Sequence, residues 1–267
     1  KIAKELFKIG LPLVPTFVIY WVYNSTDRIM ITNFLGTSEL GIYAIGSKIA
    51  HISQLIYMAF AGGFPYFKYS TMKDKDQISM NSKLFEYLGI ISFISLFLIL
   101  PFNKIIFNFM FEGDFTKGHI VFPYLYLAPL LLMLFQILGS QFIVIKKSYL
   151  STMTLSLGAF INVILNIYLI PKIGILGAVL STLIGYVSSL LLVIIVTIKM
   201  KLFTISVRFI IVSIFVVVDL IIFQNNIFNI YIVNLILIFF TIIMYINEVK
   251  ILFLKLRRKI KNDFKNN

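Results

Sequence analysis

The chain has 267 residues, of which 60% are hydrophobic and only 13% are charged. Soluble domains are typically about 45–50% apolar and about 25% charged, so this composition excludes an ordinary soluble enzyme, a disordered tail and a small secreted domain built on disulfides. The net charge of +13 is compatible with nucleic-acid binding, or with a membrane protein that collects Lys and Arg in the loops on one side.

Eight segments are long and apolar enough to cross a bilayer as helices, which takes about 20 mostly apolar residues. The segments do not alternate as lipid-facing barrel strands would, and helices satisfy their backbone polar groups internally, as lipid demands. The predicted fold is therefore all-α, a polytopic membrane helix bundle with about eight transmembrane helices. The predicted spans are 10–33, 41–64, 84–109, 120–143, 151–170, 176–198, 208–224 and 228–247.

The Lys and Arg residues sort between alternate loops. Most of the 24 lie at the two termini or in loops on one side of the membrane, whereas Lys104, Lys117 and Lys172 lie on the other side. By the positive-inside rule both termini are cytoplasmic, and the charge follows from topology, so no nucleic-acid partner is expected. Residues 248–267 alternate apolar and basic residues, which predicts a cytoplasmic tail on the anionic inner leaflet.

The first predicted span carries a polar stripe. An ionisable side chain at the bilayer centre costs about 2.5–3.5 kcal/mol, so the polar residues kept there are informative. At about 100° per residue, Tyr20, Asn24, Asp27 and Arg28 all lie on one side of this helix.

The second predicted span carries a similar stripe, formed by Lys48, His51 and Gln54. Two neighbouring helices with polar stripes predict a water-accessible surface between lobes of the protein. The alternative interpretation is a set of hydrogen bonds between helices that hold the bundle together.

Asp27 and Lys48 lie at similar depths in this predicted hairpin. Asp27 precedes Gly36 by about nine residues and Lys48 follows it by about twelve, a depth difference of about 4.5 Å at 1.5 Å per residue. We therefore expect a salt bridge between Asp27 and Lys48, which leaves Arg28 free for an anionic ligand. In the alternative both cations face the ligand and Asp27 tunes them. Arg suits phosphate because its guanidinium donates two parallel hydrogen bonds.

The candidate substrate-binding residues are therefore Arg28, Lys48, His51, Asn24, Tyr20 and Gln54. A structural or coupling role is expected for Asp27, Asn162, Asn166 and Asp219. Asn162 and Asn166 share one helix face and are interpreted as interhelical packing contacts, and Asp219 is expected to extend toward water near the outer end of its span. The chain has no Cys, only two His and no phosphate-binding glycine loop, so we expect no enzyme activity, cofactor or metal.

Three stretches resemble one transporter family. The runs GLPLVPTF (10–17) and DRIMITNFLGTSELGIYAIGSKI (27–49) resemble the start of the second half of polysaccharide flippases, within the multidrug/oligosaccharidyl-lipid/polysaccharide exporter superfamily. The run NVILNIYLIPKIGILGAVLSTLIGY (162–186) resembles the Asn-rich helix, Ile-Pro turn and Gly-Ala helix start of that family. The resemblance implies two six-helix lobes that alternate access around a central cavity.

The resemblance implies that residues 1–200 are the second six-helix lobe, that 201–247 are two appended transmembrane helices, and that 248–267 are the basic tail. Because the chain starts at Lys1 rather than Met, about six further helices are expected before it. The N-terminal half of the same protein is then a partner, together with membrane lipid and a polysaccharide polymerase.

The function implied by the resemblance is the flipping of undecaprenyl-pyrophosphate-linked oligosaccharide across the bacterial inner membrane, for O-antigen, capsule or related polysaccharides. The pyrophosphate would bind Arg28 and Lys48, with the sugar in the cavity and the polyprenyl tail in lipid. One alternative is a cation-coupled multidrug antiporter, against which these two cations argue. Another is a membrane-embedded polysaccharide polymerase or ligase, which needs a large external loop that this sequence lacks, and a structural membrane subunit is a third.

Overall fold

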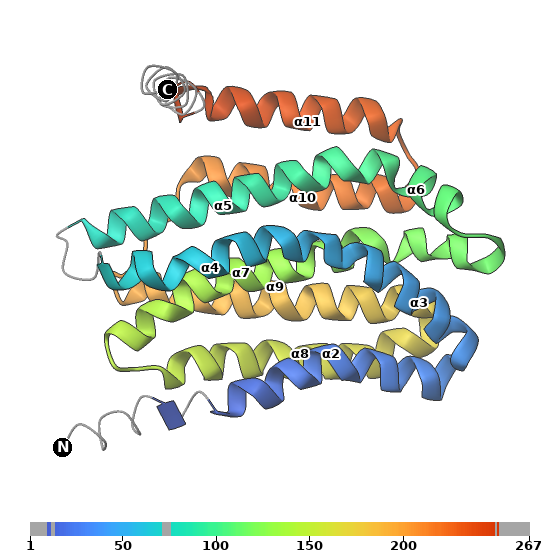
Figure 1. Cartoon of the computed structure of the whole chain (residues 1–267), viewed down its shortest axis with the longest axis horizontal. Coiled ribbons are helices and arrows are strands. Elements are labelled where there is room, and N and C mark those ends of the chain that lie inside the picture. Colours follow the sequence, from blue (N-terminus) through green and yellow to red (C-terminus); the bar gives the residue numbers. More distant parts are fainter. Residues whose placement is uncertain (1–9, 12–13, 71–75, 249, 251–267) are drawn as a thin grey trace, which may run out of the picture.

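The computed structural model describes residues 10–11, 14–70, 76–248 and 250, and these form helices without any β-strand. The helices lie side by side, and the chain runs from one end of the bundle to the other and back (Figure 1). The α-helices are α2 (Val14–Leu35), α3 (Thr37–Ala50), α4 (Gln54–Ser70), α5 (Gln77–Ile99), α6 (Asn103–Met110), α7 (Phe122–Val144), α8 (Tyr149–Ile173), α9 (Ile175–Lys199), α10 (Val207–Asn225) and α11 (Ile230–Met244). Three 3-10 helices connect them, η2 (His51–Ser53), η3 (Leu100–Phe102) and η4 (Gly113–Ile120).

Each of the eight predicted spans coincides with one helix or with a run of helices. Five are long and apolar enough to cross a membrane, namely Gln77–Met110, Phe122–Val144, Tyr149–Ile173, Ile175–Lys199 and Val207–Asn225. Helix α11 is apolar but has 15 residues, and the polar side chains of α2 and of the α3–α4 run lower their hydropathy. The predicted all-α polytopic membrane bundle is confirmed.

Two of the predicted spans are interrupted within the bundle. Between α5 and α6, η3 contains Pro101, which has no backbone N–H to donate to the helix. Between α3 and α4, η2 begins at His51, and the sequence there contains neither proline nor glycine. Short 3-10 segments inside helices are frequent at hinges, so the second predicted span is two helices joined at His51 rather than one.

Basic side chains gather at one end of the bundle, which we call the basic end. It contains Lys146 and Lys147 between α7 and α8, Lys199 at the end of α9 and Lys201 directly after it. The opposite end, here the far end, contains the turns at Gly36 and Gly174 and the loop that joins α10 to α11. In Figure 1 the basic end is on the left. The separation of charge agrees with the sequence prediction, and the assignment of the basic end to the cytoplasm stays a prediction.

Helix α7 runs through the middle of the bundle, and most of its side chains are buried. Helices α8 and α9 pack along one another, α2 lies against α8, and α10 and α11 lie against α5. The division into a lobe and two appended helices remains a prediction. Most of the predicted tail at 248–267 lies outside the described residues.

Candidate functional site

The Asp27 carboxylate is buried where four helices meet. Its side chain is 1% exposed, and no Lys or Arg of the described residues forms an ion pair with it. The Tyr43 hydroxyl of α3 donates to Oδ2 at 2.7 Å and the Thr182 hydroxyl of α9 donates to the same oxygen at 2.5 Å. The Asn166 amide of α8 donates to Oδ1 at 2.7 Å. The carboxylate of α2 therefore joins α3, α8 and α9 through neutral donors.

Two glycines allow these helices to approach one another beside Asp27. A methyl group on Gly185 would lie 2.9 Å from the Asn162 Cβ, and one on Gly158 would overlap the Tyr23 hydroxyl and the Gly185 carbonyl. The Tyr23 ring lies beside these two glycines and stacks on Tyr186, with 4.2 Å between the ring centres. Small residues at helix crossings serve this purpose in membranes, because close backbones bring short polar side chains into contact.

The predicted salt bridge between Asp27 and Lys48 is wrong. Lys48 is exposed, and the structure gives it no ion pair with a described residue. Tyr43, five residues earlier on α3, meets Asp27 instead. Five residues turn a helix by about 140° from the starting direction, so Lys48 points away when Tyr43 faces α2.

A cavity of about 130 Å³ lies next to this carboxylate, between α2, α3, α7 and α9. Its lining includes four of the predicted substrate-binding residues, Asn24, Arg28, His51 and Gln54, together with Asp27. The rest of its polar lining comes from Tyr23, Tyr43, Ser47, Thr182 and Tyr186. The predicted polar stripes on the first two spans thus lie on one cavity.

Arg28 is exposed and pairs with no carboxylate among the described residues. Its neighbour Asp27 is held by three helices, which fixes the rotation of α2 and directs Arg28 to the cavity. The His51 Nδ1 lies 2.5 Å from the Ser47 carbonyl oxygen, which leaves Nε2 for other partners. A guanidinium, an imidazole and two carboxamides are groups that bind phosphate and sugar hydroxyls.

Two of the predicted site residues do not line the cavity, and a third is partly engaged. Lys48 and Tyr20 are absent from the lining. The Gln136 amide of α7 donates to the Tyr20 hydroxyl at 3.4 Å, and the Tyr57 hydroxyl donates to the Gln136 carbonyl oxygen at 3.1 Å. The Asn24 amide donates to its own helix at Tyr20, which leaves its carbonyl oxygen for a ligand. Tyr20 of α2 therefore contacts Gln136 of α7 and, through it, Tyr57 of α4.

Oxygen atoms dominate the surroundings of Asp27. Asn162 and Asn166 are fully buried, and the carbonyl oxygen of each has no hydrogen-bond partner. The Asn162 amide donates to the Thr182 hydroxyl at 3.1 Å, so both residues join helices, as the sequence indicated. Carboxylate and amide oxygens are ligands for hard cations, and a cation is one species that this cluster could hold. The described residues contain no group of three or more His, Cys, Asp or Glu side chains suited to a metal ion.

Asp219 differs from its prediction. It is fully buried between α10 and α11 rather than extended toward water, and its Oδ1 accepts a hydrogen bond from the Asn234 amide at 3.0 Å. Its Oδ2 and the Asn234 carbonyl oxygen have no partner. The reason is that α11 packs its polar residue Asn234 against α10 at that height.

Sequence reasoning missed Thr182, Tyr186 and Ser189 of α9. Thr182 donates to Asp27, Tyr186 stacks on Tyr23, and the Ser189 hydroxyl lies 3.1 Å from the Tyr23 hydroxyl. Their signal is present, because the three fall at intervals of three or four residues on one face of α9, together with Gly185.

Comparisons with known proteins relate the chain to membrane proteins and to polysaccharide biosynthesis. A family model described as polysaccharide biosynthesis protein matches residues 1–109. An uncharacterized membrane protein of Methanocaldococcus jannaschii is 28% identical over 195 residues, which are 70% of this chain and 38% of the relative. Agl15 of Haloferax volcanii, named as a probable low-salt glycan biosynthesis flippase, is 26% identical over 191 residues, 70% of this chain and 40% of the relative.

The chain therefore spans about two fifths of the length of the curated relatives it matches. No solved structure matches it. The matched family model covers α2, α3, α4 and α5 and nearly all of α6. This region includes the cavity residues of the first two predicted spans. Residues 1–109 are thus similar to a polysaccharide biosynthesis family, and one relative of the chain is named as a probable glycan flippase.

Proposed function

We propose that the chain is part of a flippase that moves polyprenyl-pyrophosphate-linked oligosaccharide across a membrane. In the more specific form the carrier is undecaprenyl pyrophosphate, the membrane is a bacterial inner membrane, and the product serves O-antigen, capsule or related polysaccharide assembly. The observation that carries the proposal is Arg28, an unpaired cation among the described residues, at a cavity whose other lining groups include His51, Asn24 and Gln54.

The proposed mechanism follows from the different surroundings of Asp27 and Arg28. Asp27 ties α2 to three other helices, so α2 moves together with them when the lobe moves. Arg28 binds the pyrophosphate through two parallel hydrogen bonds, and the amides bind sugar hydroxyls. The cavity of about 130 Å³ is far smaller than an oligosaccharide, so the proposal makes it one wall of a larger cavity completed by the N-terminal half. Rocking of one lobe against the other would then reorient the site.

The lining of the cavity favours an anionic substrate over the cationic drugs of an antiporter. Among the described lining residues the one carboxylate is Asp27, and its oxygens already accept three hydrogen bonds. Arg28 adds a positive charge on the same wall. The name of one relative, a probable glycan biosynthesis flippase, also favours transport over an enzymatic reaction.

The test replaces Arg28 in the full-length protein and measures surface glycan divided by the amount of protein in the membrane. We expect Arg28→Ala to keep normal abundance and to lose most glycan export, because a charge-assisted hydrogen bond contributes about 1.5–3 kcal/mol. Arg28→Lys should recover only part of the export, since it keeps the charge and loses the fork.

The matched control is Lys172→Ala, which removes an exposed cation from the end of α8, away from the cavity. This variant should export normally. Normal export by Arg28→Ala would show that the pyrophosphate binds elsewhere and would overturn the assigned site.

A further inference from the structure

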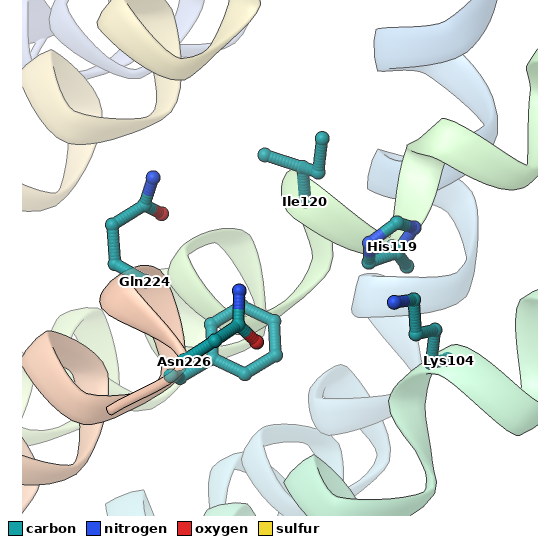
Figure 2. A pocket seen from close by; sticks show the side chains of 6 residues that line it. Lys104, His119, Ile120, Gln224 and Asn226 are labelled. Atoms are coloured by element: carbon teal, nitrogen blue, oxygen red, sulfur yellow. The ribbon is translucent and has the colours of Figure 1, made fainter. Parts of the chain in front are cut away.

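A second polar pocket, of about 210 Å³, lies at the far end of the bundle and is separate from the cavity beside Asp27. Figure 2 shows Lys104 and His119 on one side of it and Gln224 and Asn226 on the other. These residues come from α6, from η4 and from the end of α10, three parts of the chain that the proposed transport site does not use. We call this the far-end pocket.

Lys104 and Gln224 supply hydrogen-bond donors to the far-end pocket. Lys104 has no ion pair with a described residue. The His119 Nδ1 lies 2.8 Å from the Thr116 carbonyl oxygen and therefore carries a hydrogen, and the Nε2 of a neutral ring accepts rather than donates. The Gln224 carbonyl oxygen accepts from the Tyr124 hydroxyl at 2.8 Å, so its amide N–H groups remain free to donate. Since none of the described residues that line the pocket is a carboxylate, the Lys104 ammonium and the Gln224 amide suit an oxyanion.

Buried neighbours hold these groups in place. The Asn103 amide, 1% exposed, donates to the His119 carbonyl oxygen at 2.7 Å and so fixes η4 against α6. Tyr124, 2% exposed, fixes the side chain of Gln224 in the same way. The donors are therefore prearranged, which lowers the entropy lost when a ligand binds.

A mostly apolar pocket of about 160 Å³ adjoins the far-end pocket. The two pockets share Lys104, Phe223 and Asn226. The remaining walls of the second pocket are apolar or aromatic, formed by Leu100, Pro101, Ile222, Phe228, Ile230 and Tyr231. A polar pocket joined to an apolar one fits a ligand with a charged head and a hydrocarbon chain.

The position along the bundle also fits an amphiphile. The pockets lie where α10 ends and α11 begins, at the end of a helix long and apolar enough to cross a membrane. Tyr231 and Phe102, whose rings lie 6.1 Å apart edge to face, are at the same level. Aromatic side chains and lysines concentrate at the membrane–water interface, the depth at which phospholipid phosphates lie.

We propose that these two pockets bind one anionic phospholipid, with its phosphate between Lys104 and the Gln224 amide and an acyl chain against Phe228, Ile230 and Tyr231. The lipid joins α6 and η4 to the α10–α11 pair. This site does not rest on the proposed transport function, because the two pockets share no residue with the cavity beside Asp27.

The test uses full-length protein purified in an uncharged detergent, and it measures how the midpoint of thermal unfolding changes with probe concentration. The probes are dihexanoyl phosphatidylglycerol, dihexanoylglycerol without the phosphate, and inorganic phosphate. A ligand of the folded state raises the midpoint, which gives an apparent Kd for each probe. We expect the phosphatidylglycerol to bind at least about tenfold more tightly than either of the other probes.

Two variants probe the pocket and two serve as controls. Lys104→Ala should weaken phosphatidylglycerol binding about tenfold, the factor that corresponds to one charge-assisted hydrogen bond. Gln224→Glu keeps the acceptor for Tyr124 and replaces the donating amide with a negative charge, so it should weaken binding by a similar factor. Lys104→Arg and Lys172→Ala should bind as the unaltered protein does.

Three results would overturn the proposal. Unchanged phosphatidylglycerol binding in Lys104→Ala would remove the pocket as the site. Equal protection by dihexanoylglycerol would show a hydrocarbon site without phosphate recognition. Equal protection by inorganic phosphate, lost in Lys104→Ala, would show a site for a free anion and not for a lipid. Because Lys104 is exposed and unpaired among the described residues, its removal should leave the midpoint without probes unchanged.

Discussion

Asp27 and Asp219 are both fully enclosed by helices, yet their partners differ. Asp27 accepts hydrogen bonds from three residues on three helices. Asp219 accepts one hydrogen bond from Asn234, and its second oxygen and the Asn234 carbonyl oxygen have no partner. Both oxygens of the Asp27 carboxylate accept hydrogen bonds, although the Asn162 and Asn166 carbonyl oxygens beside it have no partner among the described residues. At Asp219 a carboxylate oxygen itself has no such partner, and an unpaired charged group costs more free energy in a medium of low polarity than an unpaired amide does.

The difference shows which helices are joined by polar contacts midway along the bundle. Helices α2, α3, α8 and α9 are joined through Asp27 next to the cavity. At the basic end, Glu86 of α5 joins α10 and α11. Its carboxylate accepts hydrogen bonds at 2.5 Å from Ser206, directly before α10, and from Tyr245, directly after α11. We call α2, α3, α8 and α9, joined through Asp27, the frame around the cavity. A single polar substitution in this frame is therefore expected to have the largest effect on stability.

The largest expected effect is that of Asp27→Ala, about 4 kcal/mol lost from the free energy of unfolding. Hydrogen bonds between membrane helices average about 0.6 kcal/mol, and a charged partner roughly doubles each one, so the loss of three bonds costs about 4 kcal/mol. Denaturant titration of the purified full-length protein measures it. Asn24→Ala, one turn earlier on the exposed face, is the control and should change stability by less than about 0.5 kcal/mol. A loss no larger than that of the control would mean that the Asp27 contacts do not hold the frame.

Gly158→Ala tests the close approach that forms the Asp27 cluster. The added methyl group would overlap Tyr23, Ser189 and the Gly185 backbone, and overpacking of this kind costs about 1–3 kcal/mol. The control is Gly62→Ala in α4, where nothing lies within 4 Å of the added atom. Because alanine favours a helix by about 1 kcal/mol over glycine, the control should gain stability. If the two variants had effects of the same sign, the close approach of α8 and α9 would not matter for stability.

The same change, Asp to Asn, should have opposite effects at the two carboxylates. At position 219 the new amide can donate to the unpaired Asn234 carbonyl oxygen and still accept from the Asn234 amide, so Asp219→Asn should gain about 1 kcal/mol. At position 27 the new N–H groups would face donors, so Asp27→Asn should lose stability. Thermal unfolding of both variants measures the signs. A loss in both would show that Asp219 is needed as a carboxylate, and would remove the contrast between the two regions.

The sequence was sufficient for the helices of the described residues and for part of the polar stripes. Apolar length located the helices, and Asn24, Arg28, His51 and Gln54 line one cavity. Tyr20 and Lys48 of the same stripes do not line it. Periodicity describes one helix at a time, so it could not show how α3 is rotated against α2, and Tyr43 rather than Lys48 became the partner of Asp27. The partners of Asn162 and Asn166 depend on where α8 crosses α9, which the glycines and the Tyr23 ring determine together. The break at His51 has no proline or glycine to signal it.

Lys48→Ala has the smallest expected effect, below about 0.5 kcal/mol, because an exposed side chain without an ion pair contributes little. The salt bridge expected from the sequence would make the same substitution cost about 3–5 kcal/mol, since it would leave a buried charge without its partner. The double variant Asp27→Ala with Lys48→Ala separates the two cases. A pair would let the double variant recover part of the stability lost in Asp27→Ala, whereas the structure predicts no recovery. Normal abundance of Lys48→Ala would also make its glycan export a direct measure of whether this exposed cation binds substrate.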